Sequence, residues 1–360
     1  MQKTVLNSIH KDLGAKMAPY GGFEMPIQYS GVKREHMAVR NSVGVFDVSH
    51  MGEFIIEGSN SLQLLQKICS NDISKIGIGK AQYNCFPNEA GGVVDDLIVY
   101  RIKENKYFLV VNASNIDKDW KWISKWNKHF KANIQNISNQ ISLLAIQGPK
   151  AIQVAQYLSK ADLKSLSFYS HVTTKFAGKE NVLVATTGYT GSGGVEIYCL
   201  NDDVIEIWKS IFKIGNQFDI IPVGLAARDT LRTEMGYCLY GNEINDQISP
   251  ISAGLGWITK PASGCISNKQ FENEKVKGTD KKLIGIILSE RGIPRSNYKI
   301  FDDSNHVIGN VSSGTHSPSL EKGIGLGYVK SSFSSIGTKI YIEIRNKKVE
   351  ATIVNLPFIK

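Results

Sequence analysis

The segment Gly188-Tyr189-Thr190-Gly191-Ser192-Gly193-Gly194-Val195-Glu196 concentrates four glycines in seven positions, between two runs of strand-forming residues. Glycine permits tight turns and lets a ligand approach the backbone closely. The ring of Tyr189 can stack on a flat heterocycle, and the carboxylate of Glu196 can accept two hydrogen bonds from the edge of one. The segment therefore predicts a turn between two strands that forms part of a small-molecule site.

A purely structural hairpin turn explains the same segment equally well from the residues alone. Residues 182–186 and 195–198 are strand-like, and glycine-rich hairpin turns are common. The segment is not a phosphate-binding loop, because no Gly-Lys-Ser/Thr sequence follows it. It also lacks the helix and the last glycine of a dinucleotide-binding fingerprint.

Length and composition indicate a globular chain of more than one domain. Its 360 residues exceed the usual size of a single hydrophobic core. The contents of 42% hydrophobic and 21% charged residues are ordinary for such a chain. No apolar run approaches the ~18 residues of a membrane span, and the N-terminus lacks the apolar segment of a secretory signal. We expect a cytoplasmic protein that does not bind a membrane.

The cysteines and histidines do not form a metal-binding pattern. Five cysteines are scattered without a Cys-x-x-Cys pair, which indicates reduced and mostly buried thiols. The seven histidines lack the His-x-His and His-x-x-x-His spacings of zinc sites. We therefore expect no metal.

The chain is basic, with 42 lysines and arginines against 33 acidic residues and a formal net charge of +9. The basic residues are dispersed, and no basic run with interleaved aromatic residues is present, so we expect no nucleic-acid binding. An acidic protein partner or an anionic substrate fits the charge better. A generally basic composition is the simplest alternative cause.

Hydrophobic periodicity predicts alternating helices and strands up to about residue 275, which is a mixed α and β organisation. Ser114 and Pro149 are suited to helix starts. The expected helices are 116–123, 204–211 and one that begins at Pro149, and the expected strands are 93–100, 107–111 and 141–146.

Only strands are expected from residue 283 onward. Residues 275–282 are charged, as in a linker. Residues 340–344 and 349–353 alternate between apolar and polar side chains around a turn at 346–348, which predicts a hairpin with one buried face. The last ~80 residues are therefore predicted to form a small antiparallel barrel or sandwich.

Asp95 and Asp96 are adjacent carboxylates inside the apolar strand 93–100. Neighbouring strand residues point to opposite faces, so one of the two faces a mostly apolar side. A buried carboxylate without a partner is costly, and such a residue usually has a specific function or a specific donor. The alternative is a structural aspartate that accepts backbone amides where the strand begins.

Four further residues are candidates for the same pocket. Tyr83 lies upstream of the Asp-Asp pair and Asn112 ends the following strand, although both also suit ordinary strand ends. Met51 is flexible and suits a pocket for a ring. Its neighbour His50 is a candidate acid–base residue, with a structural histidine as the alternative.

Residues 222–234 are predicted to start a helix on which Arg228 and Arg232 lie four apart and share a face. Two guanidinium groups on one face can clamp a carboxylate, and the alternative is pairing within the helix to Asp229 or Glu234. A pocket with aromatic side chains, a buried carboxylate and an arginine pair suits a flat anionic heterocycle such as folate.

Motifs along nearly the whole chain resemble those of the glycine cleavage T-protein family, the tetrahydrofolate-dependent aminomethyltransferases. The glycine-rich and Asp-Asp segments also occur in folate-dependent demethylases and in the folate domains of dimethylglycine and sarcosine oxidoreductases, whereas the N-terminal motifs favour the T-protein family. The motifs stand in family order: Gly14-Ala15-Lys16-Met17, Gly21-Gly22-Phe23-Glu24-Met25-Pro26, Arg40-Asn41-Ser42-Val43-Gly44-Val45-Phe46-Asp47-Val48-Ser49-His50-Met51-Gly52, residues 91–100, Gln147-Gly148-Pro149, residues 188–196 and residues 224–232.

The resemblance implies an α+β fold with three domains around a central folate channel. Two of them are mixed α/β domains and the third is a C-terminal antiparallel β-barrel. The implied boundaries are 1–53 with 138–242 for the first domain, 54–137 with 243–275 for the second, and 283–360 for the barrel.

The resemblance also implies a site. Tetrahydrofolate is the co-substrate, Asp96 is the catalytic residue near folate nitrogen 10, and Glu196 meets the pterin edge. The C-terminal sequence Leu356-Pro357-Phe358-Ile359-Lys360 departs from the aromatic-rich extension of the family, so the likeness does not extend to a C-terminal tyrosine. The other side chains that the likeness places in the folate site are Met51, Tyr83, Asn112, Tyr189, Arg228 and Tyr237.

The implied reaction transfers the methylene carbon from the S-aminomethyl-dihydrolipoyl arm of the H-protein to tetrahydrofolate, with release of ammonia and formation of 5,10-methylenetetrahydrofolate. The expected partners are the lipoylated H-protein and folate. One alternative is a related demethylase that acts on a free small methylated substrate. Another is a folate-binding module without transfer activity, against which the presence of Asp96 argues.

Overall fold

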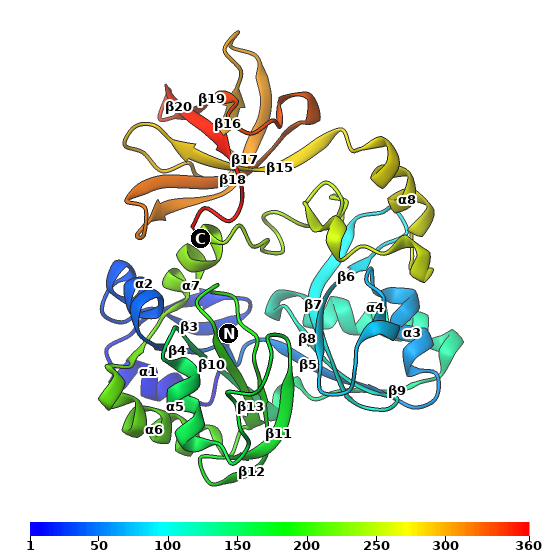
Figure 1. Cartoon of the computed structure of the whole chain (residues 1–360), viewed down its shortest axis with the longest axis vertical. Coiled ribbons are helices and arrows are strands. Elements are labelled where there is room, and N and C mark those ends of the chain that lie inside the picture. Colours follow the sequence, from blue (N-terminus) through cyan, green and yellow to red (C-terminus); the bar gives the residue numbers. More distant parts are fainter. Residues whose placement is uncertain (360) are drawn as a thin grey trace. The chain divides into compact units, whose positions relative to one another are not determined.

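The computed structural model describes residues 1–359. Helices and β-sheets alternate in the earlier part of the chain, and the C-terminal strands form a closed β-barrel (Figure 1). The predicted fold class is therefore confirmed, while the finer division into three domains stays a prediction. Lys360, the last residue of the expected barrel, lies outside the described residues. The chain divides into two compact units, of which the first comprises Met1–Leu65, Ile73–Tyr83 and Leu97–Asp229 and the second Gln66–Asp72, Asn84–Asp96 and Thr230–Lys360.

A six-stranded sheet in the order β11–β12–β13–β10–β4–β14 forms the centre of the first unit. Its strands pair antiparallel except β14, which runs parallel to β4. Helices α5 and α6 lie together beside this sheet (Figure 1). The bounds are β11 His171–Phe176, β12 Lys179–Ala185, β13 Gly194–Leu200, β10 Ile141–Gln147, β4 Gly44–Asp47, β14 Ile221–Pro222, α5 Ala151–Leu158 and α6 Val204–Gly215.

The two faces of β13 have different surroundings. Val195, Ile197 and Cys199 belong to the hydrophobic core that the sheet shares with α5 and α6. Since alternate residues of a strand point to one face, Glu196 and Tyr198 point to the other face, away from that core. The strand alternation predicted from the sequence therefore places Glu196 where it can meet a ligand or a second layer.

A second sheet of five strands, in the order β6–β7–β8–β5–β9, carries α4 on one face. The rings of Phe54 on β5 and Trp120 on α4 have centroids 5.3 Å apart, so the apolar side of the predicted helix packs on this sheet. The bounds are β6 Ala81–Pro87, β7 Val93–Lys103, β8 Lys106–Val111, β5 Gly52–Glu57, β9 Asn133–Asn136, α3 Ser61–Ile68 and α4 Ile116–Phe130.

Apart from the C-terminal barrel, the remaining elements are a three-stranded sheet in the order β1–β3–β2, four helices and short 3₁₀ turns. Their bounds are β1 Gln2–Lys3, β2 Lys16–Tyr20, β3 Phe23–Gln28, α1 Asn7–Asp12, α2 Val32–Asn41, α7 Leu225–Glu234, α8 Asn268–Lys277, η1 Ile73–Lys75, η2 Ala113–Asn115, η3 Ser138–Gln140, η4 Asn216–Phe218, η5 Leu255–Trp257, η6 Pro261–Ser263 and η7 Ser331–Phe333.

The start of α7 is fixed by a buried carboxylate on α2. Glu35 is fully buried, and its Oε2 accepts the N–H of Gly224 at 2.8 Å. A side chain at position 224 has no room, because a Cβ there would lie 2.2 Å from the Ile27 carbonyl oxygen. This anchor sets the direction of the helix that carries Arg228.

The C-terminal strands close into a barrel in the order β15–β18–β17–β16–β19–β20, with an aliphatic core. The predicted hairpin is confirmed, with its turn at Arg345 and Asn346, because Lys347 already pairs with Ile344. The bounds are β15 Lys281–Leu288, β16 Lys299–Phe301, β17 Val307–Ser317, β18 Lys322–Lys330, β19 Lys339–Ile344 and β20 Lys347–Val354.

The linker predicted from the charged residues 275–282 is shorter in the structure. Helix α8 continues to Lys277, and β15 begins at Lys281. Lysines in a last helical turn are favourable, because the C-terminal end of a helix carries partial negative charge. Gly278, with φ +83°, ends the helix in a conformation that other residues rarely adopt.

A buried ion pair connects the end of α7 to the following loop in the second unit. The Arg232 Nη1 donates to Glu243 Oε2 at 2.9 Å, and both side chains are almost fully buried. Glu243 Oε1 accepts the Ser312 hydroxyl at 2.6 Å, and Ser313 Oγ accepts Arg232 Nη2 at 2.9 Å. The expected ligand clamp with Arg228 is therefore wrong for Arg232, whose guanidinium pairs with a loop carboxylate that the helical spacing could not reveal.

Glu243→Ala should destabilise the protein by ~3–5 kcal/mol, because it leaves the Arg232 charge buried without its partner. Urea unfolding followed by circular dichroism measures this loss. Glu350→Ala removes the exposed barrel pair with Lys339 and should cost less than ~1 kcal/mol. Equal losses of stability in the two variants would contradict a stabilising role for the buried Arg232–Glu243 ion pair.

Candidate functional site

Glu196 lies at the centre of a cluster of hydroxyl groups on the face of β13 that points away from the helix-covered core. Its Oε2 accepts the Thr187 hydroxyl at 2.5 Å and the Tyr198 hydroxyl at 3.3 Å, with the Tyr100 hydroxyl at the outer limit of 3.5 Å. The Tyr100 hydroxyl also contacts those of Thr187 and Tyr198, at 3.0 and 2.9 Å. Among the described residues, every hydrogen bond to the Glu196 side chain reaches Oε2, so Oε1 is available to a ligand.

Burial controls the ionisation of this cluster. It raises the pKa of Glu196, against the opposing effects of the Thr187 hydrogen bond and the Arg228 charge. It also raises the pKa of the Tyr100 and Tyr198 phenols well above the usual value, with the Glu196 charge acting in the same direction. The two tyrosines are therefore hydrogen-bonding groups at neutral pH and not acids or bases.

Arg228 and Tyr189 form the second part of the site. The guanidinium carbon of Arg228 lies 4.3 Å from the centroid of the Tyr189 ring, which is cation–π geometry. Because the Arg228 charge also affects Glu196, three of the predicted site residues come together here.

His50 does not have the properties of a general base near neutral pH. Burial and the Arg228 charge lower the pKa of His50 to about 3, so its ring is neutral. The ring packs edge-on against Tyr20, with centroids 5.4 Å apart. These observations favour the structural interpretation of this histidine.

The glycine-rich segment is an eight-residue loop, 186–193, between the antiparallel strands β12 and β13. Gln147 holds it, because its Nε2 donates to the Thr187 carbonyl at 3.1 Å and its Oε1 accepts the Thr190 hydroxyl at 2.7 Å. A Cβ at Gly188 would lie 2.1 Å from Gln147 Oε1. Glycine is thus required for packing, and the packed loop carries Tyr189 and leads into Glu196.

Met51 and Asn112 lie at one edge of the five-stranded sheet. Met51 precedes β5 and Asn112 follows β8, and these strand ends are paired through Gly52 and Val111. Tyr83 lies on β6, the neighbour of β7 in the same sheet. These three residues belong to the first unit, as do Tyr189, Glu196 and Arg228, whereas Asp96 and Tyr237 belong to the second.

The two aspartates of β7 differ in exposure. Asp95 is fully buried, whereas Asp96 is partly exposed. By strand alternation Asp96 shares its face of β7 with Ile98 and Tyr100, and Tyr100 reaches the Glu196 cluster. Asp96 therefore lies on the same face of β7 as Tyr100, and Asp95 lies on the opposite face.

Sequence reasoning did not single out four buried polar residues of this part of the first unit. Two of them could have been found from strand spacing. Tyr198 lies two residues after Glu196, and Tyr100 lies four residues after Asp96, so each shares a strand face with a predicted site residue. Thr187 stands directly before the glycine-rich segment. Glu53 carried no signal, since a glutamate directly after Gly52 at the start of a short strand has the pattern of an exposed position.

Glu53 is fully buried on β5, and neither carboxyl oxygen has a hydrogen-bond partner among the described residues. Burial raises its pKa well above the usual glutamate value. Burial without a hydrogen-bond donor therefore favours the uncharged form of this side chain.

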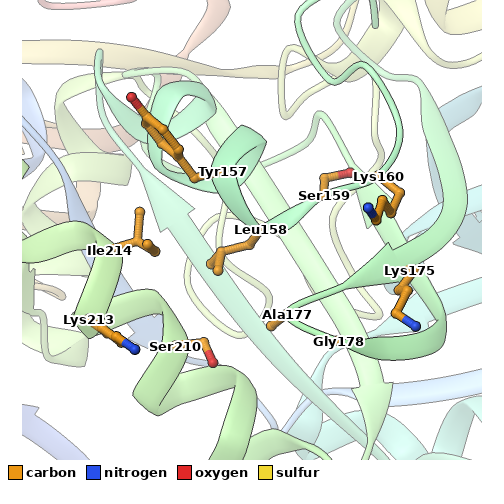
Figure 2. A pocket seen from close by; sticks show the side chains of 10 residues that line it. All are labelled: Tyr157, Leu158, Ser159, Lys160, Lys175, Ala177, Gly178, Ser210, Lys213 and Ile214. Atoms are coloured by element: carbon orange, nitrogen blue, oxygen red, sulfur yellow. The ribbon is translucent and has the colours of Figure 1, made fainter.

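A separate pocket of about 440 Å³ lies between the end of α5, the β11–β12 turn and α6 (Figure 2). Lys160, Lys175 and Lys213 make it basic, and Tyr157 extends at its rim. None of the eight predicted site residues lines it, so it is not part of the Glu196 site.

Two further properties bear on function. Within residues 1–359, no three histidine, cysteine or acidic side chains are grouped so that they could hold a metal ion. No helix in the same part of the chain is long and apolar enough to cross a membrane.

Two domain families match the chain. The GCVT N-terminal domain covers residues 6–263, and the glycine cleavage T-protein C-terminal barrel domain covers residues 281–360.

Full-length relatives and a solved structure are also similar to the chain. An aminomethyltransferase of Flavobacterium psychrophilum is 55% identical and one of Bacteroides thetaiotaomicron is 50% identical, each over 100% of both chains. The crystal structure of the glycine cleavage system aminomethyltransferase T from Bartonella henselae matches with a TM-score of 0.93 at 30% identity, and covers 99% of this chain and 98% of that one.

The raised pKa of Glu53 predicts a pH-dependent effect on stability. The folded protein holds the Glu53 proton at a pH where the unfolded chain releases it, so this residue lowers stability as pH rises above the usual value of 4.5. Glu53→Gln cannot ionise, so its stability relative to wild type should rise by up to ~1.4 kcal/mol per pH unit above that point.

Urea unfolding across the range from pH ~4 to ~8 measures the difference. Glu57→Gln is the matched control on the same strand, because the Lys106 hydrogen bond lowers the pKa of Glu57 and reverses the sign. Parallel stability profiles of Glu53→Gln and wild type would show that Glu53 is ionised in the folded protein.

Proposed function

Because the chain belongs to the glycine cleavage T-protein family and is a tetrahydrofolate-dependent aminomethyltransferase of that system, we propose that the Glu196 site binds the pterin ring of tetrahydrofolate. The observation that carries this proposal is the asymmetry of the Glu196 carboxylate. Three hydroxyl groups surround Oε2, and Oε1 is available to accept a hydrogen bond from the edge of a heterocycle. Arg228 and Tyr189 add the positive charge and the aromatic ring that suit an anionic, flat ligand.

The remaining expected residues complete the proposed site. Met51, Tyr83, Asn112 and Tyr237 would contact folate, with Asp96 as the catalytic residue. Asp96 would orient the folate near nitrogen 10 and stabilise the positive charge that develops as the methylene is transferred. It would also relay a proton between the reacting nitrogen and the leaving group.

The proposed reaction starts from the aminomethyl group on the dihydrolipoyl arm of the H-protein. The C–N bond breaks and the nitrogen leaves as ammonia, while sulfur stabilises the electron-poor methylene. The carbon becomes bonded to nitrogen 5 of tetrahydrofolate and then to nitrogen 10, as the C–S bond breaks and frees the thiol. The two protons lost from the folate nitrogens end on ammonia and on the thiol.

The basic charge of the chain supports an acidic carrier protein as the partner. A formal net charge of +9 would increase the rate of encounter with a negatively charged H-protein surface. The alternative of a demethylase acting on a free methylated substrate is not favoured, because the full-length relatives are aminomethyltransferases. The decisive assay is ammonia release from aminomethylated H-protein with and without tetrahydrofolate, and no dependence on either reactant would refute the proposal.

Asp96→Asn should lower turnover in this assay at least ~100-fold, because it removes the charge that stabilises the transition state. Folate affinity should be largely kept, since the amide has nearly the same shape. Steady-state kinetics and equilibrium binding separate the two effects. Asp117→Asn on α4 is the exposed control, and turnover of Asp96→Asn close to that control would exclude the catalytic role.

Glu196→Ala should weaken tetrahydrofolate binding by ~10- to 100-fold, the value of a hydrogen bond to a charged group. Isothermal titration calorimetry measures the affinity. Glu180→Ala removes an exposed carboxylate on the neighbouring strand β12 and should bind as wild type does. Unchanged affinity in Glu196→Ala would mean that the residue serves only the turn.

A further inference from the structure

Arg40, in the last turn of α2, connects that helix to the glycine-rich loop. Its Nη1 donates to the Thr190 carbonyl oxygen and to the Ser192 hydroxyl oxygen, the latter at 2.7 Å. The Thr190 hydroxyl in turn donates to Gln147 Oε1 at 2.7 Å. The residue directly after Tyr189 is therefore fixed from two sides, by Arg40 through its backbone and by Gln147 through its side chain.

The composition of this loop makes it dependent on such contacts. Gly191 and Gly193 have φ angles of +70° and +74°. Glycine loses more conformational freedom than any other residue when it becomes ordered. A hydrogen bond from a charged donor is roughly twice as strong as one between neutral groups. The Arg40 guanidinium is therefore well suited to offset the cost of ordering the loop.

The other end of α2 fixes the partner of Tyr189. Glu35 accepts the N–H of Gly224, directly before α7, and Arg228 follows four residues later on that helix. The same carboxylate anchors α2 itself, because its Oε1 accepts the backbone N–H groups of residues 29–31 at 2.7 to 3.0 Å. One helix, anchored at its own start, thus contacts the segment that carries Arg228 and the segment that carries Tyr189.

The contact between these two segments is sensitive to small displacements. The Arg228 guanidinium carbon lies 4.3 Å from the centroid of the Tyr189 ring. Cation–π attraction is significant only within ~6 Å of the centroid, so a movement of the ring by ~2 Å would remove it. The position of the loop backbone beside Tyr189 therefore decides whether the pair forms.

We propose that Arg40 is a positioning residue for ligand binding, which holds Tyr189 against Arg228 before the heterocycle arrives. The proposal rests on the proposed folate function. A ring that is already in place loses less conformational freedom when the ligand binds, which increases affinity. Arg40 acts on binding through Tyr189 and takes no part in the chemical step.

The competing explanation is that Arg40 contributes only to the stability of the fold. In that case Arg40→Ala should lower the unfolding temperature and leave ligand affinity unchanged, or change it independently of Tyr189. A double-mutant cycle separates the two explanations, because residues that act as one unit give non-additive losses.

The cycle measures tetrahydrofolate affinity by calorimetry in the full-length wild type, Arg40→Ala, Tyr189→Ala and the double variant. Arg40→Ala should weaken binding ~5- to 20-fold, and the double variant should bind within ~2-fold of Tyr189→Ala. Wild-type affinity in Arg40→Ala, or losses that multiply in the double variant, would overturn the proposal.

Kinetics and a conservative variant add a second readout. In the ammonia-release assay, Arg40→Ala should raise the KM for tetrahydrofolate and leave kcat within ~2-fold of wild type. Arg40→Lys keeps the charge and has three donors, so it should bind more tightly than Arg40→Ala. Arg34→Ala, at an exposed position of α2, is the control and should behave as wild type does. A fall in kcat with unchanged KM would contradict a positioning role.

Hydrogen exchange measures the loop without any ligand. Amides of residues 188–194 should exchange at least ~10-fold faster in Arg40→Ala than in wild type or Arg34→Ala, because the loop opens more often. Unchanged exchange would also overturn the proposal. Failure of the wild type itself to bind tetrahydrofolate would instead refute the proposed function, on which the exchange measurement does not depend, so the two failures are distinguishable.

Discussion

Edge-on contacts of the Tyr198 ring with Phe108 and Tyr100 join the two sheets of the first unit, and the rest of the site depends on them. The ring centroids lie 5.2 and 5.7 Å apart. Because Tyr100 comes from the five-stranded sheet and Glu196 from the six-stranded sheet, the Tyr100 hydroxyl comes near Glu196 only when the sheets are packed together. The packed aromatic rings also exclude water, which raises the pKa of the Glu196 carboxyl and strengthens each hydrogen bond to it.

Sequence periodicity was sufficient to predict the strand and the turn around Glu196, but it could not identify the residues of the other sheet that contact Glu196. The alternation of Val195, Glu196 and Ile197 correctly indicates a strand with one apolar face, and the glycines before it correctly indicate a turn. Both interpretations of the glycine-rich segment survive, because its loop is packed against Gln147 and also carries Tyr189 beside Arg228. The partner of Glu196 on the other sheet depends on tertiary contacts between residues about a hundred positions apart, which no local pattern records.

Charged residues show more clearly that local sequence patterns do not record tertiary partners or burial. Helical spacing places Arg228 and Arg232 on one face, yet Arg232 is buried against Glu243, which lies beyond the helix end. For the Asp95–Asp96 pair, alternation predicts opposite faces but cannot say which face is the core, and burial identifies Asp95 as the inner residue. Glu53 has the ordinary pattern of an exposed strand position, so only the layer packed over it reveals its burial.

The contrast between Glu53 and Glu196 follows from the donors around each carboxyl group. Burial raises the pKa of both carboxyl groups, but at Glu196 hydroxyl donors and the Arg228 charge oppose that rise, whereas at Glu53 burial acts alone.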